Sequence, residues 1–333
     1  MNPNPRPKHL EIRTYQPSNN DGWRLYLQRV RNPERHDPRL KPILIIPGYG
    51  MNSFIFGYHP RGQAMDDYLA EHGFEVWSVN FRGADKTIRE GGQRAYGFRE
   101  IVKSDMPAAI DVIARQTASA SKQVDLIGCS LGGTYVYAYA ALERDDRVGS
   151  LVGMGAPLRW ERVHPLLRIA FANPTLVGLI RLSNTRRLAT AALPYVAKAP
   201  GLLKIYLHPE IVDLSRPEML ARTVEDPNPR LNKQIAHWVL NKDLMIDGAN
   251  VSERLKDVTN PIYCMIANAD GIVPEDTAVS VLRLAGSTAK DTVVCGDDAV
   301  RMAHADMFIS NHAHERVFEP LARWLKSQQD TAS

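Results

Sequence analysis

Cysteine is scarce in this chain, and long apolar runs and blocks of like charge are missing. The three cysteines, Cys129, Cys264 and Cys295, form no Cys-x-x-Cys pair, so we expect neither a disulfide framework nor a metal site. The longest apolar region, residues 166–182, is interrupted by arginines and a proline, which predicts no membrane-spanning segment. The net charge of +4 is spread along the chain, so we expect no nucleic-acid partner.

The amino-terminal residues 1–10 also lack the apolar core of a secretory signal, which favours a cytoplasmic protein. Hydrophobic residues make up 44% and charged residues 23% of the chain, as in ordinary globular proteins. A chain of 333 residues is long for one domain and short for two. These values indicate one core with a large insertion.

The most informative stretch is Gly-Cys-Ser-Leu-Gly at residues 128–132, a G-x-S-x-G motif. A β-type run precedes it and a helical stretch follows it, so Ser130 is predicted on a sharp strand-to-helix turn that exposes its hydroxyl. Gly128 and Gly132 put no side chain in the way of this turn. The alternative is a turn that merely needs small residues, but the context favours a nucleophile.

A serine nucleophile needs a base, and the base needs an acid that orients it. Asp270 follows the predicted strand 261–267 in a turn, at the sheet edge where catalytic groups of α/β sheets gather. The alternative is a residue that only caps this turn. Since the order in such folds is Ser, then Asp, then His, Asp270 is the predicted acid.

Ten histidines compete for the role of the base. His304 lies between the last predicted strand and the last predicted helix, where it can fold back over the serine. The other nine precede the serine, lie in the insertion or occupy a helix start. Position and chain order therefore predict His304 as the base.

The reaction also needs two N–H donors for the oxyanion that forms on the substrate. One is the backbone N–H of Leu131, directly after the nucleophile. The second is expected from the glycine turn 47–51, with the N–H of Tyr49 as the first candidate and that of Met51 as the second. The alternative is an ordinary glycine-rich loop.

Strand and helix patterns alternate along most of the chain and predict an α/β fold. Residues 1–40 form an extension with an edge hairpin, 41–157 and 256–333 form the core, and 158–255 form a helical insertion. The helix over 105–114 is predicted to begin with Ser104 as its N-cap. We expect a mostly parallel sheet with helices on both faces and a cap over it.

These residues resemble the α/β-hydrolase superfamily and, within it, acid lipases of the gastric and lysosomal type. The likeness rests on four stretches: residues 73–83, residues 105–111 with Thr117 following, the Ser130 turn, and residues 304–308. The resemblance implies a lipase or esterase. The sequence departs from that family at Pro47 and Cys129, where the family usually has histidine. The family's oxyanion-hole geometry and its substrate are therefore not transferred to this chain.

The core is also similar, more distantly, to polyhydroxyalkanoate synthases, whose nucleophile is the cysteine of G-x-C-x-G. Here the central residue of the motif is Ser130, and Cys129 is the residue directly before it. A turn of this kind exposes only its central residue, so Cys129 is expected to face the core as a small hydrophobic residue.

The sequence therefore predicts a serine carboxylic-ester hydrolase that acts on an apolar ester through an acyl-enzyme, without metal or organic cofactor. The ester is a small molecule or a lipid, and the insertion could contact lipid surfaces. Acyl transfer, polymer synthesis and thioester hydrolysis use the same triad and stay open as alternatives. A third alternative is a binding protein on the same fold. Oligomeric state, acyl length and head group are not predicted.

Overall fold

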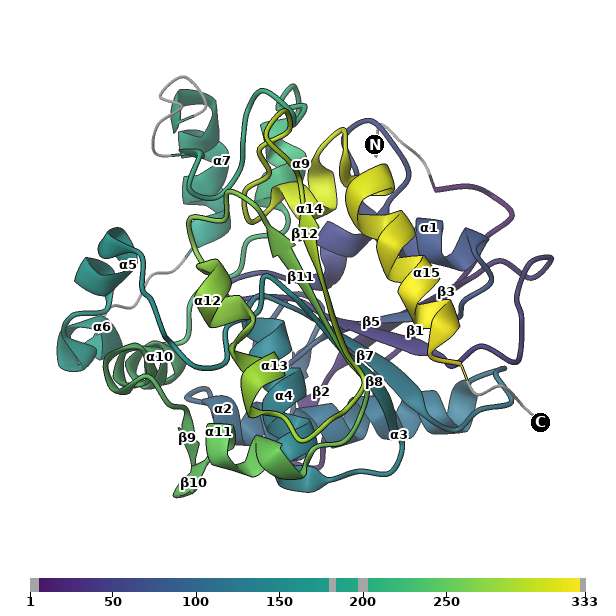
Figure 1. Cartoon of the computed structure of the whole chain (residues 1–333), viewed down its shortest axis with the longest axis horizontal. Helices are drawn as coiled ribbons and strands as arrows, with labels where there is room; N and C mark the ends of the chain where they lie inside the picture. Colours follow the sequence, from purple (N-terminus) through teal and green to yellow (C-terminus); the bar gives the residue numbers. More distant parts are fainter. Residues whose placement is uncertain (1–5, 180–183, 197–202, 330–333) are drawn as a thin grey trace.

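The computed structural model describes residues 6–179, 184–196 and 203–329, and a single large sheet forms its centre (Figure 1). This sheet has eight strands in the order β1-β3-β5-β4-β7-β8-β11-β12. From β5 to β12 all neighbours are parallel, whereas β3 runs antiparallel to both β1 and β5. The strands are β1 (Glu11–Tyr15), β3 (Tyr26–Arg31), β4 (Ile43–Ile46), β5 (Val76–Asn80), β7 (Val124–Cys129), β8 (Val148–Met154), β11 (Ile262–Ala267) and β12 (Lys290–Cys295).

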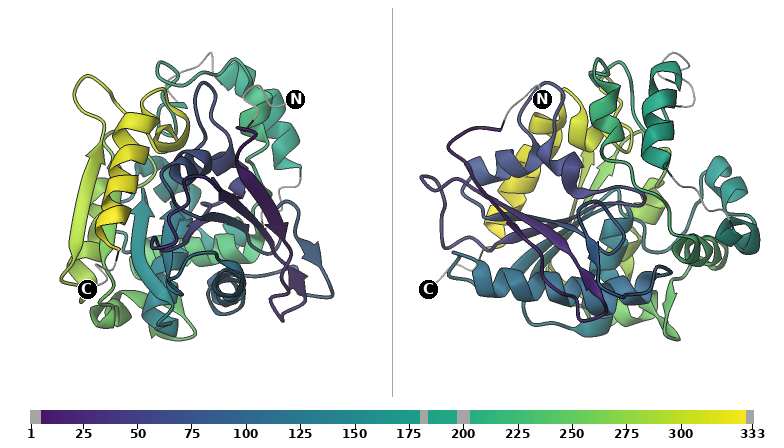
Figure 2. Two further views of the ribbon diagram at one scale, coloured as in Figure 1. Left: turned by 90° about the vertical axis from the view of Figure 1, so that its right-hand side faces the viewer. Right: turned by 180° about the vertical axis from the view of Figure 1, so that it is seen from behind.

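Helices cover both faces of the sheet, because its central strands are apolar on both sides. In β4, Leu44 and Ile46 face one cluster of buried residues, and Ile43 and Ile45 face the other. The first cluster contains α3 (Met106–Gln116) and α4 (Leu131–Glu143), and the second contains α1 (Met65–Glu71) and α15 (Glu319–Ser327). Figure 2 shows α15 and α3 on opposite sides of the strands. The predicted mostly parallel sheet with helices on both faces is confirmed.

Short elements complete the core at its edges. The strands β2 and β6 pair, as do β9 and β10, and a turn of 3₁₀-helix follows β4. The bounds are β2 (Trp23–Arg24), β6 (Ile88–Arg89), β9 (Met245–Ile246), β10 (Ala249–Asn250), η1 (Ser53–Gly57), α12 (Glu275–Ala278), α13 (Ser280–Leu284), α14 (Asp306–Ile309) and the π-helical turn η4 (His314–Phe318).

The helix before the nucleophile strand begins earlier than the sequence predicts. It runs without a break through α2 (Phe98–Glu100), the π-helical turn η2 (Ile101–Asp105) and α3. Its first turn is capped by Gly97, whose N–H donates to the Glu100 carboxylate at 2.8 Å. The prediction of Ser104 as N-cap is therefore wrong: the π turn already interrupts the helical hydrogen bonding just before Pro107, so the proline's missing N–H is tolerated inside the helix.

A buried ion pair joins the end of β5 to this helix. The Arg82 guanidinium lies 2.8 Å from the Asp105 carboxylate, and both side chains are fully buried. Asn19 adds a hydrogen bond of 2.6 Å to Asp105. Because removing one partner of such a pair leaves an uncompensated buried charge, the network holds the turn after β5 against the helix layer.

The connection between β8 and β11, residues 155–261, carries most of the helices outside the two layers. In Figure 1 most of its helices lie on the left, beside the sheet. Residues 180–183 and 197–202 of this connection lie outside the described residues, so the predictions that fall on them are not addressed, and the same holds for 1–5 and 330–333. Its helices are α5 (Pro165–Ala170), α6 (Pro174–Leu179), α7 (Thr185–Val196), α9 (Pro217–Ala221), α10 (Pro229–Asn241), α11 (Val251–Arg254) and η3 (Leu255–Asp257).

The last part of this connection returns to the core. Leu244, Val251 and Leu255 are buried in the same cluster as α4. Among the helices in the described part of the chain, none is long and apolar enough to cross a bilayer.

One buried histidine makes the core sensitive to acid. The ring of His59 donates from Nε2 to the Ser310 carbonyl at 3.0 Å, while Nδ1 accepts the N–H groups of Arg61 and Gly62 at 3.2 and 2.8 Å. Burial, with a smaller contribution from nearby His314, lowers the pKa of His59 to about 4. A proton on Nδ1 would also face two N–H donors, so the folded protein keeps this ring neutral.

We therefore expect the free energy of unfolding to fall as the pH drops from about 6.5 to about 4. In this range the His59 imidazole is protonated in the unfolded chain but stays neutral in the folded protein. The loss attributable to His59 is up to about 3 kcal/mol. Urea unfolding across this pH range measures it, and His59→Gln should flatten the slope. The exposed His72, changed to Gln, is the control; an equal effect of both variants would contradict the assignment.

Candidate active site

Ser130 occupies a strained position between β7 and α4. Its backbone has φ 53° and ψ −123°, a conformation that costs on the order of 1–3 kcal/mol for a residue with a side chain. Glycines make the turn possible: a Cβ on Gly128 would lie 2.2 Å from the Cα of Gly133, and one on Gly132 would lie 2.4 Å from the Ile46 carbonyl oxygen. Close packing keeps Ser130 in this strained backbone conformation, which the predicted strand-to-helix turn requires.

Asp270 and His304 meet at the carboxyl ends of the neighbouring strands. The Nδ1 atom of His304 lies 2.6 Å from Oδ2 of Asp270, and both side chains are almost fully buried. The other carboxylate oxygen accepts the N–H groups of Ile272 and Val273 at 2.8 and 2.9 Å. The turn therefore fixes the carboxylate, and the carboxylate fixes the imidazole. Among the residues that the structure describes, Nε2 of His304 has no hydrogen-bond partner.

The β8–β11 connection also anchors the loop that carries His304. The N–H of Ala305 donates to the Tyr206 carbonyl at 2.8 Å. The buried Asp306 carboxylate accepts the N–H groups of Ala303 and His208 at 2.7 and 3.1 Å. No sequence pattern indicates this support, because it joins segments about a hundred residues apart.

Gly155 leaves room for the Asp270–His304 pair. Its φ is +54°, and a Cβ there would lie 3.0 Å from Cε1 of His304 and 3.1 Å from Oδ2 of Asp270. A side chain at this position must push against both groups, whereas Gly248 has a similar φ of +78° and nothing within 4 Å of its added Cβ.

We therefore expect Gly155→Ala and Gly248→Ala to lower stability similarly, by about 1–2 kcal/mol each from backbone strain. Only Gly155→Ala should also lower ester turnover, by about a hundredfold, because misplacing catalytic groups by about 1 Å has that effect. Thermal unfolding and turnover of the two variants, measured side by side, check this. Equal turnover would show that the pair tolerates the displacement.

The turn after β4 passes very close to the serine. A Cβ on Gly48 would lie 2.9 Å from Cβ of Ser130. The N–H of Met51 already donates to the Gly48 carbonyl at 3.3 Å, whereas in the described part of the chain the N–H groups of Tyr49 and Leu131 have no protein acceptor. Of the two candidates in this turn, the amide of Tyr49 is thus the available donor.

A short antiparallel pairing holds this turn against the β8–β11 connection. The N–H of Glu225 donates to the Gly50 carbonyl at 2.8 Å, and the N–H of Asn52 donates to the Thr223 carbonyl at 2.9 Å. The side-chain amide of Asn52 adds a bond of 2.9 Å to the Arg222 carbonyl. The position of the turn therefore depends on a segment far along the chain.

Ser130 and His304 open onto one apolar pocket of about 220 Å³. Four aromatic residues of the β8–β11 connection form much of its wall, Trp160, Phe171, Tyr206 and Trp238, with the rings of Trp160 and Trp238 packed edge to face at 5.5 Å. The other lining residues are Gly48, Tyr49, Met51, Leu131, Pro157, Leu167, Ile235, Ile272 and Val273. Such a site can take an apolar group beside the serine.

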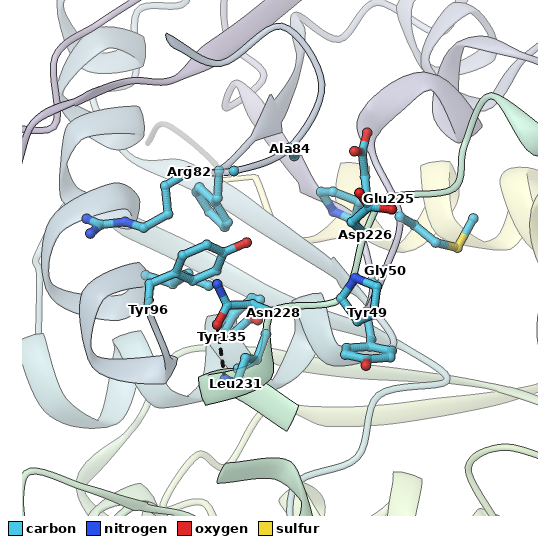
Figure 3. Close-up of a pocket in the computed structure, with 17 residues that line it drawn as sticks. Tyr49, Gly50, Arg82, Ala84, Tyr96, Tyr135, Glu225, Asp226, Asn228 and Leu231 are labelled. Atoms are coloured by element: carbon cyan, nitrogen blue, oxygen red, sulfur yellow. Dashed lines mark hydrogen bonds between the residues drawn. The ribbon is translucent and has the colours of Figure 1, made fainter. Parts of the chain in front are cut away.

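A second, smaller cavity of about 60 Å³ shares Gly48, Tyr49 and Met51 with the apolar pocket (Figure 3). In Figure 3, Tyr49 and Glu225 lie on one side of it, and Arg82, with its guanidinium turned away, lies on the other. Burial raises the pKa of Tyr49 to about 12, so its hydroxyl stays protonated and donates to the Asn232 side chain at 2.5 Å. Polar and apolar groups both line this space, which is large enough for ordered water.

Cys129 faces the core, as predicted. Its side chain is 3% exposed, and its sulfur lies 3.9 Å from the sulfur of Met154. Burial raises the pKa of the Cys129 thiol well above its usual value, which disfavours the thiolate. Within the described ranges, no group of three or more His, Cys, Asp or Glu side chains could hold a metal ion.

Comparison with known proteins identifies the family and the fold. A family model described as alpha/beta hydrolase fold matches residues 41–283. A tear acid lipase-like protein of Mesocricetus auratus is 29% identical over 130 residues, which cover 35% of this chain and 32% of that protein. The lysosomal acid lipase/cholesteryl ester hydrolase of Homo sapiens is 26% identical over 176 residues, covering 49% of this chain and 41% of that protein.

The chain thus matches less than half the length of either relative, and the predicted resemblance to acid lipases is confirmed at low identity. An esterase of Exiguobacterium antarcticum superposes over 94% of this chain and 98% of its own, with a TM-score of 0.61 and 18% identity, which is a likeness of fold. Because the family model spans well over half of the sequence, this protein belongs to the alpha/beta hydrolase fold family.

Proposed function

We propose that the protein is a serine hydrolase of carboxylic esters with an apolar acyl group. One observation carries the proposal: Ser130 on its strained turn and His304, which is hydrogen-bonded to Asp270, border the same apolar pocket. The likeness to lipases and esterases supports this reaction class. The names of the relatives suggest a lipid or similar apolar ester as the substrate.

In the proposed mechanism, Nε2 of His304 removes the proton from Ser130 as the hydroxyl oxygen attacks the acyl carbon. Asp270 keeps Nδ1 of His304 protonated and stabilises the imidazolium. The N–H groups of Leu131 and Tyr49 hold the oxyanion. His304 then protonates the leaving alcohol, and water attacks the acyl-enzyme in the same way to release the acid.

The β8–β11 connection is proposed to act as a cap. It supplies the aromatic wall of the pocket and, through Glu225 and Thr223, positions the turn that carries Tyr49. Exposed apolar side chains on its helices, among them Ile169 and Leu179, are 74% and 70% accessible. These helices would give the cap a surface that can contact lipid.

The test is hydrolysis of p-nitrophenyl esters from acetyl to palmitoyl, combined with mass spectrometry of the acylated protein. We expect turnover with a preference for apolar acyl chains, and a trapped acyl group on the peptide that contains Ser130. Adding a competing alcohol separates hydrolysis from acyl transfer, since a transferase would convert the ester mainly to the new ester. A folded protein that turns over no ester and is never acylated would overturn the proposal.

The aromatic wall should set the preferred acyl length. Phe171 lines the pocket but is only half-buried, so Phe171→Ala enlarges the space with little loss of stability. We expect the ratio of kcat/KM for palmitoyl over butyryl ester to rise about tenfold, since one or two buried methylenes are worth roughly 1–3 kcal/mol. The control is Leu176→Ala on the neighbouring helix α6, where Leu176 is 60% exposed. This variant should leave the ratio unchanged.

A further inference from the structure

A basic cavity of about 240 Å³ lies apart from the proposed catalytic groups, between the β3–β5 edge of the core and the β8–β11 connection. Its wall holds four cationic side chains and one carboxylate, that of Asp85. The cations come from four separate segments: Arg6, Lys86, Arg186 and Arg222.

Two of the four cations already have acidic partners. Arg6 pairs with Asp66, and its Nε atom lies 3.5 Å from Asp67. Arg186 lies 3.7 Å from Asp85 and 3.0 Å from Glu225. The charges of these two arginines are therefore compensated inside the protein.

The other two cations have aromatic rings in place of acids. The ammonium of Lys86 lies 4.5 Å from the centre of the Tyr26 ring, and the guanidinium of Arg222 lies 4.2 Å from that of Phe54. Within the part of the chain that the structure describes, neither has a carboxylate within 4.0 Å. A ring orients a cation but leaves its charge in place, so Lys86 and Arg222 present charges that no carboxylate beside them compensates.

A buried donor adds an independent sign of a missing partner. Nη1 of Arg6 is buried and has no hydrogen-bond partner among the residues that the structure describes. Space for this guanidinium is reserved by Gly57, since a Cβ there would lie 2.2 Å from its Nη2 atom. Because buried polar groups in proteins are almost always hydrogen-bonded, this donor lacks the partner that such groups usually have, in a residue that lines the cavity.

We propose that this cavity binds a phosphate group. Cations converge on it from several segments, and a phosphate has enough oxygens and charge to engage several donors at once, whereas a single carboxylate is satisfied by one arginine fork. Lys86 and Arg222 are exposed, Arg186 is partly exposed, and Arg6 is mostly buried. The occupant would join the loop after β5 to the β8–β11 connection.

The phosphate could belong to a soluble monoester or to a lipid head group, and two sets of probes distinguish these sources. Isothermal titration with inorganic phosphate and with glycerol 3-phosphate tests the soluble source. Sedimentation with phosphatidylcholine vesicles, with and without phosphatidic acid, tests the lipid source. The full-length protein is used throughout, and its thermal unfolding is followed with each soluble probe.

The variants are Lys86→Gln and Arg222→Gln, both at exposed positions, with Lys122→Gln as a control that removes one exposed charge elsewhere. Arg222→Lys keeps the charge and should keep part of the affinity. We expect saturable binding that weakens at least tenfold in the first two variants and is unchanged in the control.

Loss of soluble binding in those variants assigns the site to a phosphate monoester, and loss of phosphatidic-acid binding assigns it to a lipid head group. The proposal is overturned if neither probe binds wild type with a dissociation constant below about 1 mM. It is also overturned if all three glutamine variants bind alike. Ester turnover is not the readout, so the result is independent of the proposed reaction.

Discussion

Replacing Ser130 with alanine should lower kcat for ester hydrolysis by about 10³- to 10⁶-fold, the range expected when a triad nucleophile is removed. The substitution deletes one oxygen and keeps the same backbone strain, because alanine meets the same conformation with a Cβ of its own. Stability should therefore change little, and any loss of turnover comes from chemistry. Turnover of a p-nitrophenyl ester near the preferred length, with circular dichroism as the folding check, measures the effect.

Cys129 provides a matched control in the next position. It is the remaining candidate nucleophile in this turn, but its thiol is buried against Met154. Cys129→Ala should keep kcat within a few-fold of wild type. The double variant Ser130→Ala/His304→Ala should be no slower than the more damaged single variant, because the two groups act as a unit. If Ser130→Ala turned over esters at the wild-type rate, the proposed mechanism would be wrong.

The sequence predicted the elements that depend on local patterns. The apolar run that became β4 and the turn around Ser130 needed only neighbouring residues, and each was predicted where the structure has it. Asp270 and His304 were predicted from strand ends and chain order, and the structure brings them within 2.6 Å of each other. Local sequence was sufficient here because the sheet gathers the carboxyl ends of its strands at one edge.

What the sequence did not predict depends on how the β8–β11 connection packs. Trp160 and Trp238 are nearly eighty residues apart, yet they meet in one pocket wall. The pairing of Glu225 with Gly50 likewise has no local signal. The early helix start before Ser104 was missed for a different reason: the proline at 107 resembles a first-turn residue, and the π turn that accommodates it leaves no mark in the pattern.

The second large effect is expected from Asp270→Asn, which distinguishes a catalytic acid from a turn residue. In the wild type one carboxylate oxygen accepts the N–H groups of Ile272 and Val273, and the other faces Nδ1 of His304. Asparagine has only one oxygen, and the two backbone donors will hold it. Its NH₂ group must then point at His304.

A donor in that place forces Nδ1 to accept, so the imidazole proton moves to Nε2, the atom that should take the proton from Ser130. We expect kcat to fall by about 10⁴-fold, as for a triad histidine held in the wrong tautomer. KM and the unfolding temperature should change little, because the turn keeps both hydrogen bonds. Asp270→Ala is the contrasting variant: it removes the turn bonds as well and should lower stability together with turnover.

Steady-state kinetics and thermal unfolding of the two variants separate the roles of Asp270. If Asp270 were only a turn residue, Asp270→Asn would change neither kcat nor the unfolding temperature noticeably, because asparagine keeps the oxygen that the turn uses. Low kcat with full stability in Asp270→Asn would instead assign the lost activity to the oxygen that faces His304. That oxygen makes no other hydrogen bond in the described part of the chain, so its contribution can be measured through the histidine alone.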